Sequence, residues 1–145
     1  MGSLIAQKKI DIQLDIEQPL LLYSDRAKLR QILQNILSNA IKFTENGFIR
    51  ITIRFIPETE AVLIEISDSG RGIAKEELPH IFEPFWQAQS QPSETAKGSG
   101  LGLTIVKKTA ELLNGKINVS SSIGLGTTFT LIFPRQFPQE RRKTA

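Results

Sequence analysis

Strand-like segments in this sequence come in adjacent pairs, and this grouping limits the possible folds more than any other feature. Residues 48–56 and 61–67 are joined by Pro57-Glu58-Thr59-Glu60, a short polar stretch that favours a hairpin turn. A second such pair, residues 116–121 and 127–133, lies near the end of the chain. Because strands and helices do not alternate, the sequence predicts a mixed, mostly antiparallel sheet with helices on one face.

One more strand and a long helix are predicted in the first third of the chain. In residues 9–16 apolar and polar side chains alternate, which is the period-two pattern of a strand with one buried face. In residues 28–43 apolar side chains recur at helical spacing. Ser24-Asp25 can cap the start of this helix, and Asn46-Gly47 is expected to end it.

The segment between the two hairpins is predicted to hold short helical elements and a long loop. Residues 75–78 are expected to form one helical turn, and residues 101–113 a helix that ends at Asn114-Gly115. Between them, residues 85–99 form a polar loop rich in Gln and Ser, and loops of that length are commonly functional. The predicted fold class is therefore α+β.

Composition places these elements in one domain and excludes several functions. The chain has 145 residues, so we interpret residues 1–145 as a single domain in which residues 1–3 are vector-derived and residues 135–145 form a flexible tail. The formal net charge is +3 and the basic residues are scattered, so no broad cationic surface is predicted for nucleic acid. The absence of cysteine excludes disulfides and thiolate metal sites. No apolar run approaches the roughly 20 residues of a membrane-spanning helix.

Three polar side chains form a stripe on the predicted helix 28–43. Asn35, Asn39 and Lys42 follow one another at spacings of four and three residues, which places them within about 60° of one another around the helix. An amide oxygen is a hard, neutral donor that suits Mg²⁺, which takes its other ligands from phosphates and water. On this helix alone, a solvated flank explains the stripe equally well.

A glycine-rich segment leads directly into the predicted helix 101–113. Glycines at this position allow backbone N–H groups to approach an anion at the positive end of the helix, which predicts a phosphate site. Neither the dinucleotide-binding fingerprint nor the P-loop pattern is present. A flexible hinge is an alternative explanation for the glycines. The candidate residues are Lys97, Gly98, Ser99, Gly100, Leu101 and Gly102.

Asp68 is the candidate for recognising a base. It follows the predicted strand 61–67 and precedes Gly70-Arg71-Gly72, where the missing side chains allow a flat ligand to lie close to the backbone. Its carboxylate can accept a hydrogen bond from an exocyclic amine such as that of adenine. Taken alone, an aspartate that caps a turn is the commoner explanation. The glycine turn Gly124-Leu125-Gly126-Thr127 is equally well explained by hairpin chemistry.

Five sequence blocks together resemble the catalytic domain of sensor histidine kinases, within the wider group of gyrase, Hsp90 and MutL-type ATPases. The resemblance covers residues 24–134. The N box of the family is matched by LRQILQNILSNAIKFT, its first glycine box by DSGRGI and its F box by HIFEPF. The second glycine box is matched by GSGLGL and the closing threonine motif by GLGTTF. The resemblance implies a Bergerat-type fold, a two-layer α/β sandwich.

The resemblance also implies roles for individual residues in a site for Mg-ATP. Asn39 is expected to coordinate Mg²⁺, Asn35 to support the metal and phosphate region, and Lys42 to contact the phosphates. Asp68 is expected to bind the adenine amine, and Thr127 to help hold adenine through water. The glycines expected to make room for the base and the triphosphate are Gly70, Gly72, Gly98, Gly100 and Gly102.

The same resemblance predicts a mobile lid over the nucleotide. Phe82 and Phe85 of the F box are expected to anchor this lid, and Trp86 and residues 87–97 lie where the family has it. A tryptophan at a loop edge can equally seal the surface of the core. His80, the one histidine of the chain, is expected to pack against or near the lid rather than to accept phosphate.

The phosphate acceptor is expected to lie outside this chain. The hydrolysing ATPases of the group carry a glutamate at the position of Asn35 as a general base, and an amide cannot take that proton. The γ-phosphate is therefore expected to pass to a histidine on a separate helical dimerisation domain, with a response regulator as the downstream partner. The isolated domain is expected to be a cytoplasmic monomer that binds ATP without phosphorylating itself and does not contact the membrane, even where the parent protein is membrane-anchored.

Two other functions stay open at this point. A serine kinase or an ATPase of the same superfamily would share most of these blocks, although Asn35 and the phenylalanine-rich F box argue against a hydrolysing ATPase. The alternative from a different class is a degenerate module that docks a partner without turning over nucleotide. All five blocks are intact, so no residue favours degeneration.

Overall fold

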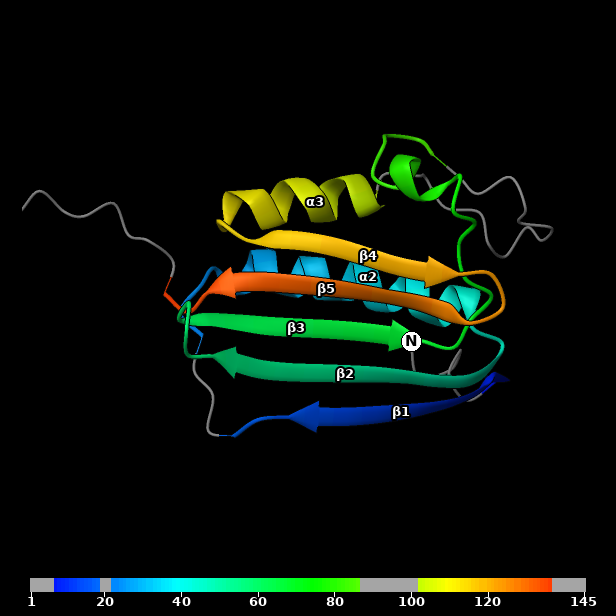
Figure 1. Cartoon of the computed structure of the whole chain (residues 1–145), viewed down its shortest axis with the longest axis horizontal. Coiled ribbons are helices and arrows are strands. Elements are labelled where there is room, and N and C mark those ends of the chain that lie inside the picture. Colours follow the sequence, from blue (N-terminus) through cyan, green and yellow to red (C-terminus); the bar gives the residue numbers. More distant parts are fainter. Residues whose placement is uncertain (1–6, 19–21, 87–101, 137–145) are drawn as a thin grey trace, which may run out of the picture.

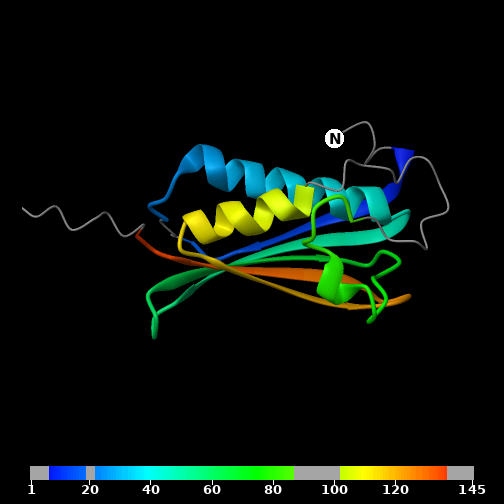
Figure 2. The same ribbon diagram turned by 90° about the horizontal axis from the view of Figure 1, so that it is seen from above.

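The computed structural model describes residues 7–18, 22–86 and 102–136, which form two layers (Figures 1 and 2). One layer is a five-stranded sheet, and the two helices α2 and α3 form the other layer on one face of it. The predicted α+β class and two-layer α/β sandwich are confirmed. The elements are β1 (Lys9–Ile16), α2 (Arg26–Phe43), β2 (Asn46–Ile56), β3 (Ala61–Asp68), the 3₁₀ helix η1 (Leu78–His80), α3 (Gly102–Leu112), β4 (Lys116–Ser122) and β5 (Gly126–Pro134).

The sheet is mixed, as the sequence predicts. Its strand order is β1-β2-β3-β5-β4. The edge strand β1 pairs parallel with β2, whereas the other three neighbouring pairs are antiparallel. Because β3 and β5 run in opposite directions, the end of β3 lies beside the start of β5, and Asp68 is the register partner of Thr127 (Figure 1).

The hydrophobic core lies between the sheet and the two helices. Along β3 the side chains alternate between buried and half-buried, because only one face of the sheet packs on the helices. Burial of this apolar surface is the main force that holds the two layers together. The most deeply buried core side chains are Ile32, Ile36, Ile49, Val62, Ile66, Ile81, Val106, Leu113, Leu131 and Phe133.

Helix α2 begins two residues earlier than predicted and ends at a different signal. It stops at Phe43, and Thr44 is its C-cap in an extended conformation with φ −109° and ψ 120°. Asn46-Gly47, predicted to end the helix, instead begins β2. The cause is a long-range contact, because Ser69 Oγ accepts a hydrogen bond from the Phe48 N–H at 2.8 Å and draws this segment to the end of β3.

The helical turn predicted at residues 75–78 is displaced along the chain. The structure has the 3₁₀ helix η1 at Leu78–His80, and residues 75–77 form a turn before it. Proline at position 79 accounts for the shift, because its fixed φ and missing N–H suit the first turn of a helix.

The end of α3 follows the prediction. Asn114 has a left-handed φ of 57°, and the Gly115 N–H donates to the Ala110 carbonyl at 2.8 Å. A Cβ at Gly115 would lie 2.4 Å from the ring of Phe133, so a glycine is needed for β5 to pack this closely. No helix in the described ranges is long and apolar enough to cross a membrane.

The first residues of the predicted C-terminal tail are tied to the domain. The Tyr23 N–H donates to the Arg135 carbonyl at 2.8 Å, and the Arg135 N–H donates to the Glu60 carbonyl at 2.9 Å. Tyr23 and Gln136 form an isolated parallel bridge. Residues 1–3 and 137–145, which the sequence analysis treats as vector and tail, lie outside the described residues.

Replacement of Asp25 by alanine is expected to lower the free energy of unfolding, because Asp25 is the N-cap of α2. Its Oδ1 accepts from the Lys28 N–H at 3.1 Å, and its Oδ2 accepts from Lys28 Nζ at 2.9 Å. These hydrogen bonds hold the pKa of Asp25 below its ordinary value, so the stabilisation is present at neutral pH and is lost as the pH falls through the lowered pKa. Urea denaturation measures the change. Asp25→Asn keeps the acceptor and should retain most of the stability; an equal loss in both variants would contradict the cap.

Candidate functional site

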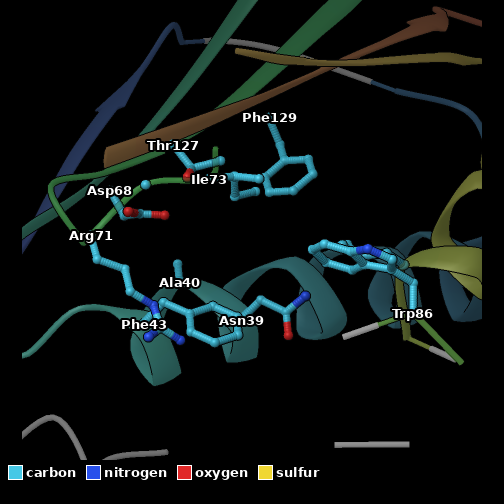
Figure 3. Close-up of a pocket in the computed structure, with 11 residues that line it drawn as sticks. Asn39, Ala40, Phe43, Asp68, Arg71, Ile73, Trp86, Thr127 and Phe129 are labelled. Carbon is cyan, nitrogen blue, oxygen red and sulfur yellow. The ribbon is translucent and has the colours of Figure 1, made fainter. Parts of the chain in front are cut away.

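A narrow pocket opens between the C-terminal half of α2, the end of β3 and the start of β5 (Figure 3). The volume available to the centre of a water molecule is about 50 Å³. Ile73 and Phe129 lie on its sheet side and Ala40 and Phe43 on its helix side, while Trp86 closes one end (Figure 3). The full lining consists of Asn39, Ala40, Phe43, Asp68, Arg71, Gly72, Ile73, Trp86, Leu103, Thr127 and Phe129.

The pocket brings together four residues that the sequence analysis selected from three separate blocks. Asn39 comes from α2, Asp68 and Gly72 from the end of β3 and the loop after it, and Thr127 from β5. Segments far apart in the chain meet here because the sheet register places Thr127 opposite Asp68. The polar lining is thus concentrated at the junction of these elements, between apolar walls, which is the usual composition of a small-molecule site.

Asp68 is the only acidic residue that lines the pocket among the described residues, and it is buried, with 8% of its surface exposed. Its Oδ1 accepts a hydrogen bond from the Gly70 N–H at 2.8 Å. Burial raises the pKa of the Asp68 carboxyl above its ordinary value, and the backbone N–H groups of Gly70 and Thr127 oppose this effect. Within the described part of the chain no ion pair neutralises the carboxylate. Its acceptor capacity is therefore available to a neutral N–H donor.

Arg71 lines the same pocket without pairing with Asp68. Its guanidinium carbon lies 4.9 Å from the centroid of the Phe43 ring, a cation–π contact. Its backbone is held on both sides, because its N–H donates to the Phe43 carbonyl at 3.4 Å and its carbonyl accepts from the Gly124 N–H at 2.8 Å. Arg71 therefore joins the loop after β3 to the end of α2 and to the β4–β5 turn.

Thr127 belongs to a hydroxyl network centred on Ser121, a residue that the sequence analysis missed. Ser121 Oγ accepts from the Ile73 N–H at 2.7 Å, donates to the Gly126 carbonyl at 2.8 Å and lies 2.8 Å from Thr127 Oγ1. A serine hydroxyl has one proton, so donation to Gly126 makes Thr127 the donor to Ser121. The lone pairs of Thr127 then remain free to accept a hydrogen bond, as a bridging water or an adenine amine would require.

Glycines in the loop after β3 and at the start of β5 allow close contacts within the protein as well as shaping the pocket. A Cβ at Gly70 would lie 2.5 Å from the Phe43 carbonyl oxygen, and a Cβ at Gly126 would lie 1.9 Å from the Asp68 carbonyl oxygen. Gly126 also has a φ of 103°, which L-residues rarely adopt. These glycines bring the loop after β3, the end of α2 and the β4–β5 turn into contact, and this contact shapes the site.

Gly72→Ala is expected to destabilise the domain by about 2 kcal/mol more than Gly124→Ala, which makes the two variants a matched pair. Both glycines have a left-handed φ, 77° at Gly72 and 82° at Gly124. A Cβ at Gly72 would lie 2.0 Å from the Ser122 carbonyl oxygen, whereas a Cβ at Gly124 would meet nothing within 4 Å. Chemical denaturation of both variants measures the difference; equal losses would show that the contact with Ser122 is not a constraint.

The side chains of the polar stripe on α2 lie at different parts of the site. Asn39 is half-buried and lines the pocket, and its amide has no hydrogen-bond partner among the described residues. Asn35 Oδ1 lies 3.9 Å from the position that a Cβ on Gly102 would take, so it faces the start of α3. The stripe therefore connects the pocket with the helix end that the glycine-rich segment enters.

Lys42 lies on the same helix but does not line the pocket. Its ammonium is 5.7 Å from the centroid of the Phe43 ring, and burial lowers its pKa from the ordinary value. In the described ranges it forms no salt bridge. Its charge is consequently available to an anion near the end of α2.

The predicted phosphate segment lies mostly outside the described residues. Of its candidates only Gly102, the first residue of α3, is described. The role of the others stays a prediction: Lys97, Gly98, Ser99, Gly100 and Leu101.

The described part of the chain has no group of three His, Cys, Asp or Glu residues that could hold a metal ion. The free amide of Asn39 can still be the one protein ligand of the expected Mg²⁺, because this ion keeps several waters and takes further ligands from phosphates.

The F box only partly fills its predicted role. Phe82 packs edge-on against Phe129, with ring centroids 6.5 Å apart, and its carbonyl accepts from Thr104 Oγ1 at 2.9 Å. Phe85, predicted to be a second anchor, is instead 74% exposed, with a left-handed φ of 63°. His80 is also exposed, and its Nδ1 lies 2.8 Å from Glu83 Oε1. Residues 87–99 of the expected lid lie outside the described residues.

Several residues that line the pocket were not predicted as site residues. They are apolar, or they lie in sequence blocks that were selected for other residues. Phe43 had a usable signal, since it continues the four-residue spacing of Asn35 and Asn39 along one face of α2. Ile73 and Phe129 had none, because an apolar residue next to a pocket and one within the core look alike in sequence.

Comparison with known proteins supports the assignment of these blocks. The family model described as "Histidine kinase-, DNA gyrase B-, and HSP90-like ATPase" matches residues 24–136. The autoinducer 2 sensor kinase/phosphatase LuxQ of Vibrio cholerae is 45% identical over 113 residues, which are 77% of this chain and 13% of LuxQ. The sensor histidine kinase RcsC of Escherichia coli is 35% identical over 143 residues, which are 95% of this chain and 15% of RcsC. The chain thus spans less than a fifth of these relatives.

Solved structures share the same architecture. Full-length ShkA in complex with AMPPNP superimposes with a TM-score of 0.80 at 33% identity, over 92% of this chain and 27% of the ShkA chain. The catalytic domain of the histidine kinase ThkA superimposes with a TM-score of 0.78 at 30% identity, over 93% of this chain and 86% of that chain.

Proposed function

The chain belongs to the histidine kinase-, DNA gyrase B- and HSP90-like ATPase family, and from this premise we propose that it is the ATP-binding catalytic domain of a two-component sensor histidine kinase. In this role it binds Mg-ATP and transfers the γ-phosphoryl group to a histidine on a separate domain. The observation that carries the proposal is the shared pocket of Asn39, Asp68 and Thr127, which come from three separate sequence blocks. The presence of AMPPNP, an ATP analogue, in the similar ShkA structure supports a nucleotide as the ligand.

The adenine end of the site would be formed by Asp68 and the apolar walls. The buried carboxylate accepts a hydrogen bond from the exocyclic amine, and Thr127 accepts a second bond, directly or through water. Ile73 and Phe129 on one side and Phe43 on the other would enclose the flat ring. A base that lacks the exocyclic amine would leave the buried carboxylate without this donor. The site should therefore select strongly for a base that carries the amine.

The phosphate end would be formed along α2. Asn39 would hold Mg²⁺ through its amide oxygen, and the bound ion would supply charge neutralisation for the triphosphate. Lys42 would contact the phosphates, because its ammonium has no carboxylate partner in the described ranges. Asn35 would support this region from its position against Gly102.

The side chain at position 35 favours transfer over hydrolysis. An amide cannot accept the proton of an attacking water, so Asn35 is no general base. Catalysis would then depend on holding the γ-phosphoryl group in line with an external nucleophile and on neutralising its charge. Hydrolysis by the isolated domain should accordingly be slow.

The partners follow from the same role. The histidine-bearing dimerisation domain of the parent kinase would receive the phosphoryl group, and a response regulator would receive it next. The curated relatives are named as sensor kinases, which supports this place in a two-component pathway. In isolation the domain would be a monomer that does not phosphorylate itself, and it would act in the cytoplasm.

A chimera tests the proposed activity. This chain would replace the matching segment of Vibrio cholerae LuxQ, and the chimera would be incubated with ATP labelled at the γ-phosphate. The expected product carries an acid-labile, base-stable label, as a phosphohistidine does. An acid-stable label would favour a serine kinase, and a chimera that binds ATP but takes up no label would contradict the proposal.

A further inference from the structure

The hydroxyl of Thr44 is buried without a hydrogen-bond partner among the described residues. Thr44 is the C-cap of α2, and its exposed surface is 0%. Burial strips the hydroxyl of water without replacing the lost bonds, so its presence lowers the stability of the fold. A valine of the same shape would avoid this loss. An orphaned hydroxyl at such a position therefore calls for a functional explanation.

The location of Thr44 supplies that explanation. The point at which a Cβ on Gly70 would sit lies 3.0 Å from Thr44 Oγ1 and 2.9 Å from Asp68 Oδ1. The orphaned donor and the buried carboxylate thus meet at one backbone position, which carries no side chain. Thr44 does not line the pocket itself, so it approaches Asp68 from the protein side.

The Asp68 carboxylate has capacity for this donor. Its Oδ1 accepts from the Gly70 N–H at 2.8 Å, and a carboxylate oxygen can accept a second bond. Arg71, the other charged residue of the pocket, lies over the Phe43 ring instead. In the described part of the chain, Thr44 is therefore an unused side-chain donor, and it lies within about 6 Å of this acceptor, since both approach the same point beside Gly70 to 3.0 Å and 2.9 Å.

We propose that Thr44 is a positioning residue of the adenine subsite, whose hydroxyl donates to the Asp68 carboxylate, directly or through one water, when nucleotide is bound. This inference rests on the proposed function. This bond fixes the orientation of the Asp68 carboxylate from the protein side. The other lone pairs of the carboxylate then accept from the exocyclic amine on the pocket side. In the nucleotide-free domain the Thr44 hydroxyl lacks this bond, and the fold is less stable as a result.

Two variants at position 44 separate binding from stability. Thr44→Val removes the hydroxyl and keeps the shape, so the melting temperature of the nucleotide-free domain should rise by about 3 °C. The dissociation constant for ATP, measured by calorimetry, should nevertheless rise about tenfold, the effect expected for one hydrogen bond to a charged group. Thr44→Ser keeps the hydroxyl and loses a methyl group, so it should melt lower and bind ATP within about twofold of the wild type.

A double-mutant cycle with Asp68→Asn tests whether Thr44 acts through Asp68. In the Asp68→Asn background, Thr44→Val should not weaken ATP binding further, whereas a general structural defect would weaken it by the same factor in both backgrounds. Wild-type affinity in Thr44→Val, or equal losses in both backgrounds, would overturn this inference alone. Failure of the wild-type domain to bind ATP would overturn the proposed function as well.

Discussion

Replacement of Asp68 by asparagine is expected to weaken ATP binding about 100-fold, the upper range for a buried hydrogen bond to a charged group. Among the described residues, Asp68 is the one acidic residue that lines the pocket. The exocyclic amine of adenine is the proposed hydrogen-bond donor to its carboxylate. An asparagine keeps the shape and still accepts from the Gly70 N–H. Its amide can, however, turn N–H groups toward the amine, which then has no acceptor.

The same variant should not destabilise the nucleotide-free domain. Because burial raises the pKa of Asp68, its carboxyl stabilises the fold in the protonated form at low pH, and this contribution is lost as the pH rises through the raised pKa. At neutral pH the buried charge opposes folding, so Asp68→Asn should melt no lower than the wild type.

Calorimetric titration with ATP and thermal melting together test both expectations. Asp11→Asn is a matched control, since Asp11 is an exposed aspartate on β1 whose carboxylate, among the residues that the structure describes, accepts from the Gln13 side chain alone. It should leave ATP affinity unchanged. If Asp68→Asn binds ATP within a few-fold of the wild type, Asp68 does not recognise the amine.

Replacement of Asn39 by alanine is expected to reduce phosphoryl transfer at least about 100-fold, because the γ-phosphoryl group would lose its metal-holding residue. The amide lines the pocket, has no partner in the described ranges, and is the donor that fits Mg²⁺. Alanine has a high helix propensity, so α2 should not be weakened by the change.

The LuxQ chimera and a Mg²⁺ titration measure this effect. In the wild type, ATP binding should strengthen as Mg²⁺ is added, and in Asn39→Ala this dependence should largely disappear while binding without metal persists. Gln34→Ala, on an exposed position of the same helix, is the control and should leave transfer unchanged. Normal label transfer in Asn39→Ala would show that another group holds the metal.

The strands could be predicted because their signals are local. The bounds of β1 and the short turn between β2 and β3 depend on consecutive residues, and both lie within one or two residues of the prediction. The buried face predicted for β1 is wrong, because Ile12, Leu14 and Ile16 are 40%, 65% and 39% exposed on this edge strand. The parallel pairing of β1 with β2 could not be assigned from the sequence, because it depends on packing between segments more than 30 residues apart. The last residue of α2, Phe43, was predicted correctly, but Asn46-Gly47 was wrongly taken as its end signal, since the contact of Ser69 with Phe48 spans 21 residues.

The site was predictable where its residues are polar and regularly spaced. Asn39 and Asp68 were selected because the five blocks together resemble the family's site, and both line the pocket. Taken alone, each had an equally good or commoner structural explanation. Ser121 and Thr44 were missed because their importance depends on the sheet register and on the crossing of the loop after β3 with the end of α2. A serine or a threonine in sequence gives no sign of whether its hydroxyl is paired.

Titration of the folded wild-type domain with Mg-ATP, followed by calorimetry and by the fluorescence of Trp86, which lines the pocket, is the decisive test of nucleotide binding. Saturable binding is expected, weaker when Mg²⁺ is removed and about 100-fold weaker in Asp68→Asn. A folded domain that produces neither heat nor a fluorescence change with ATP or ADP would contradict the proposed function, and a partner-docking module would then be the better explanation of this fold.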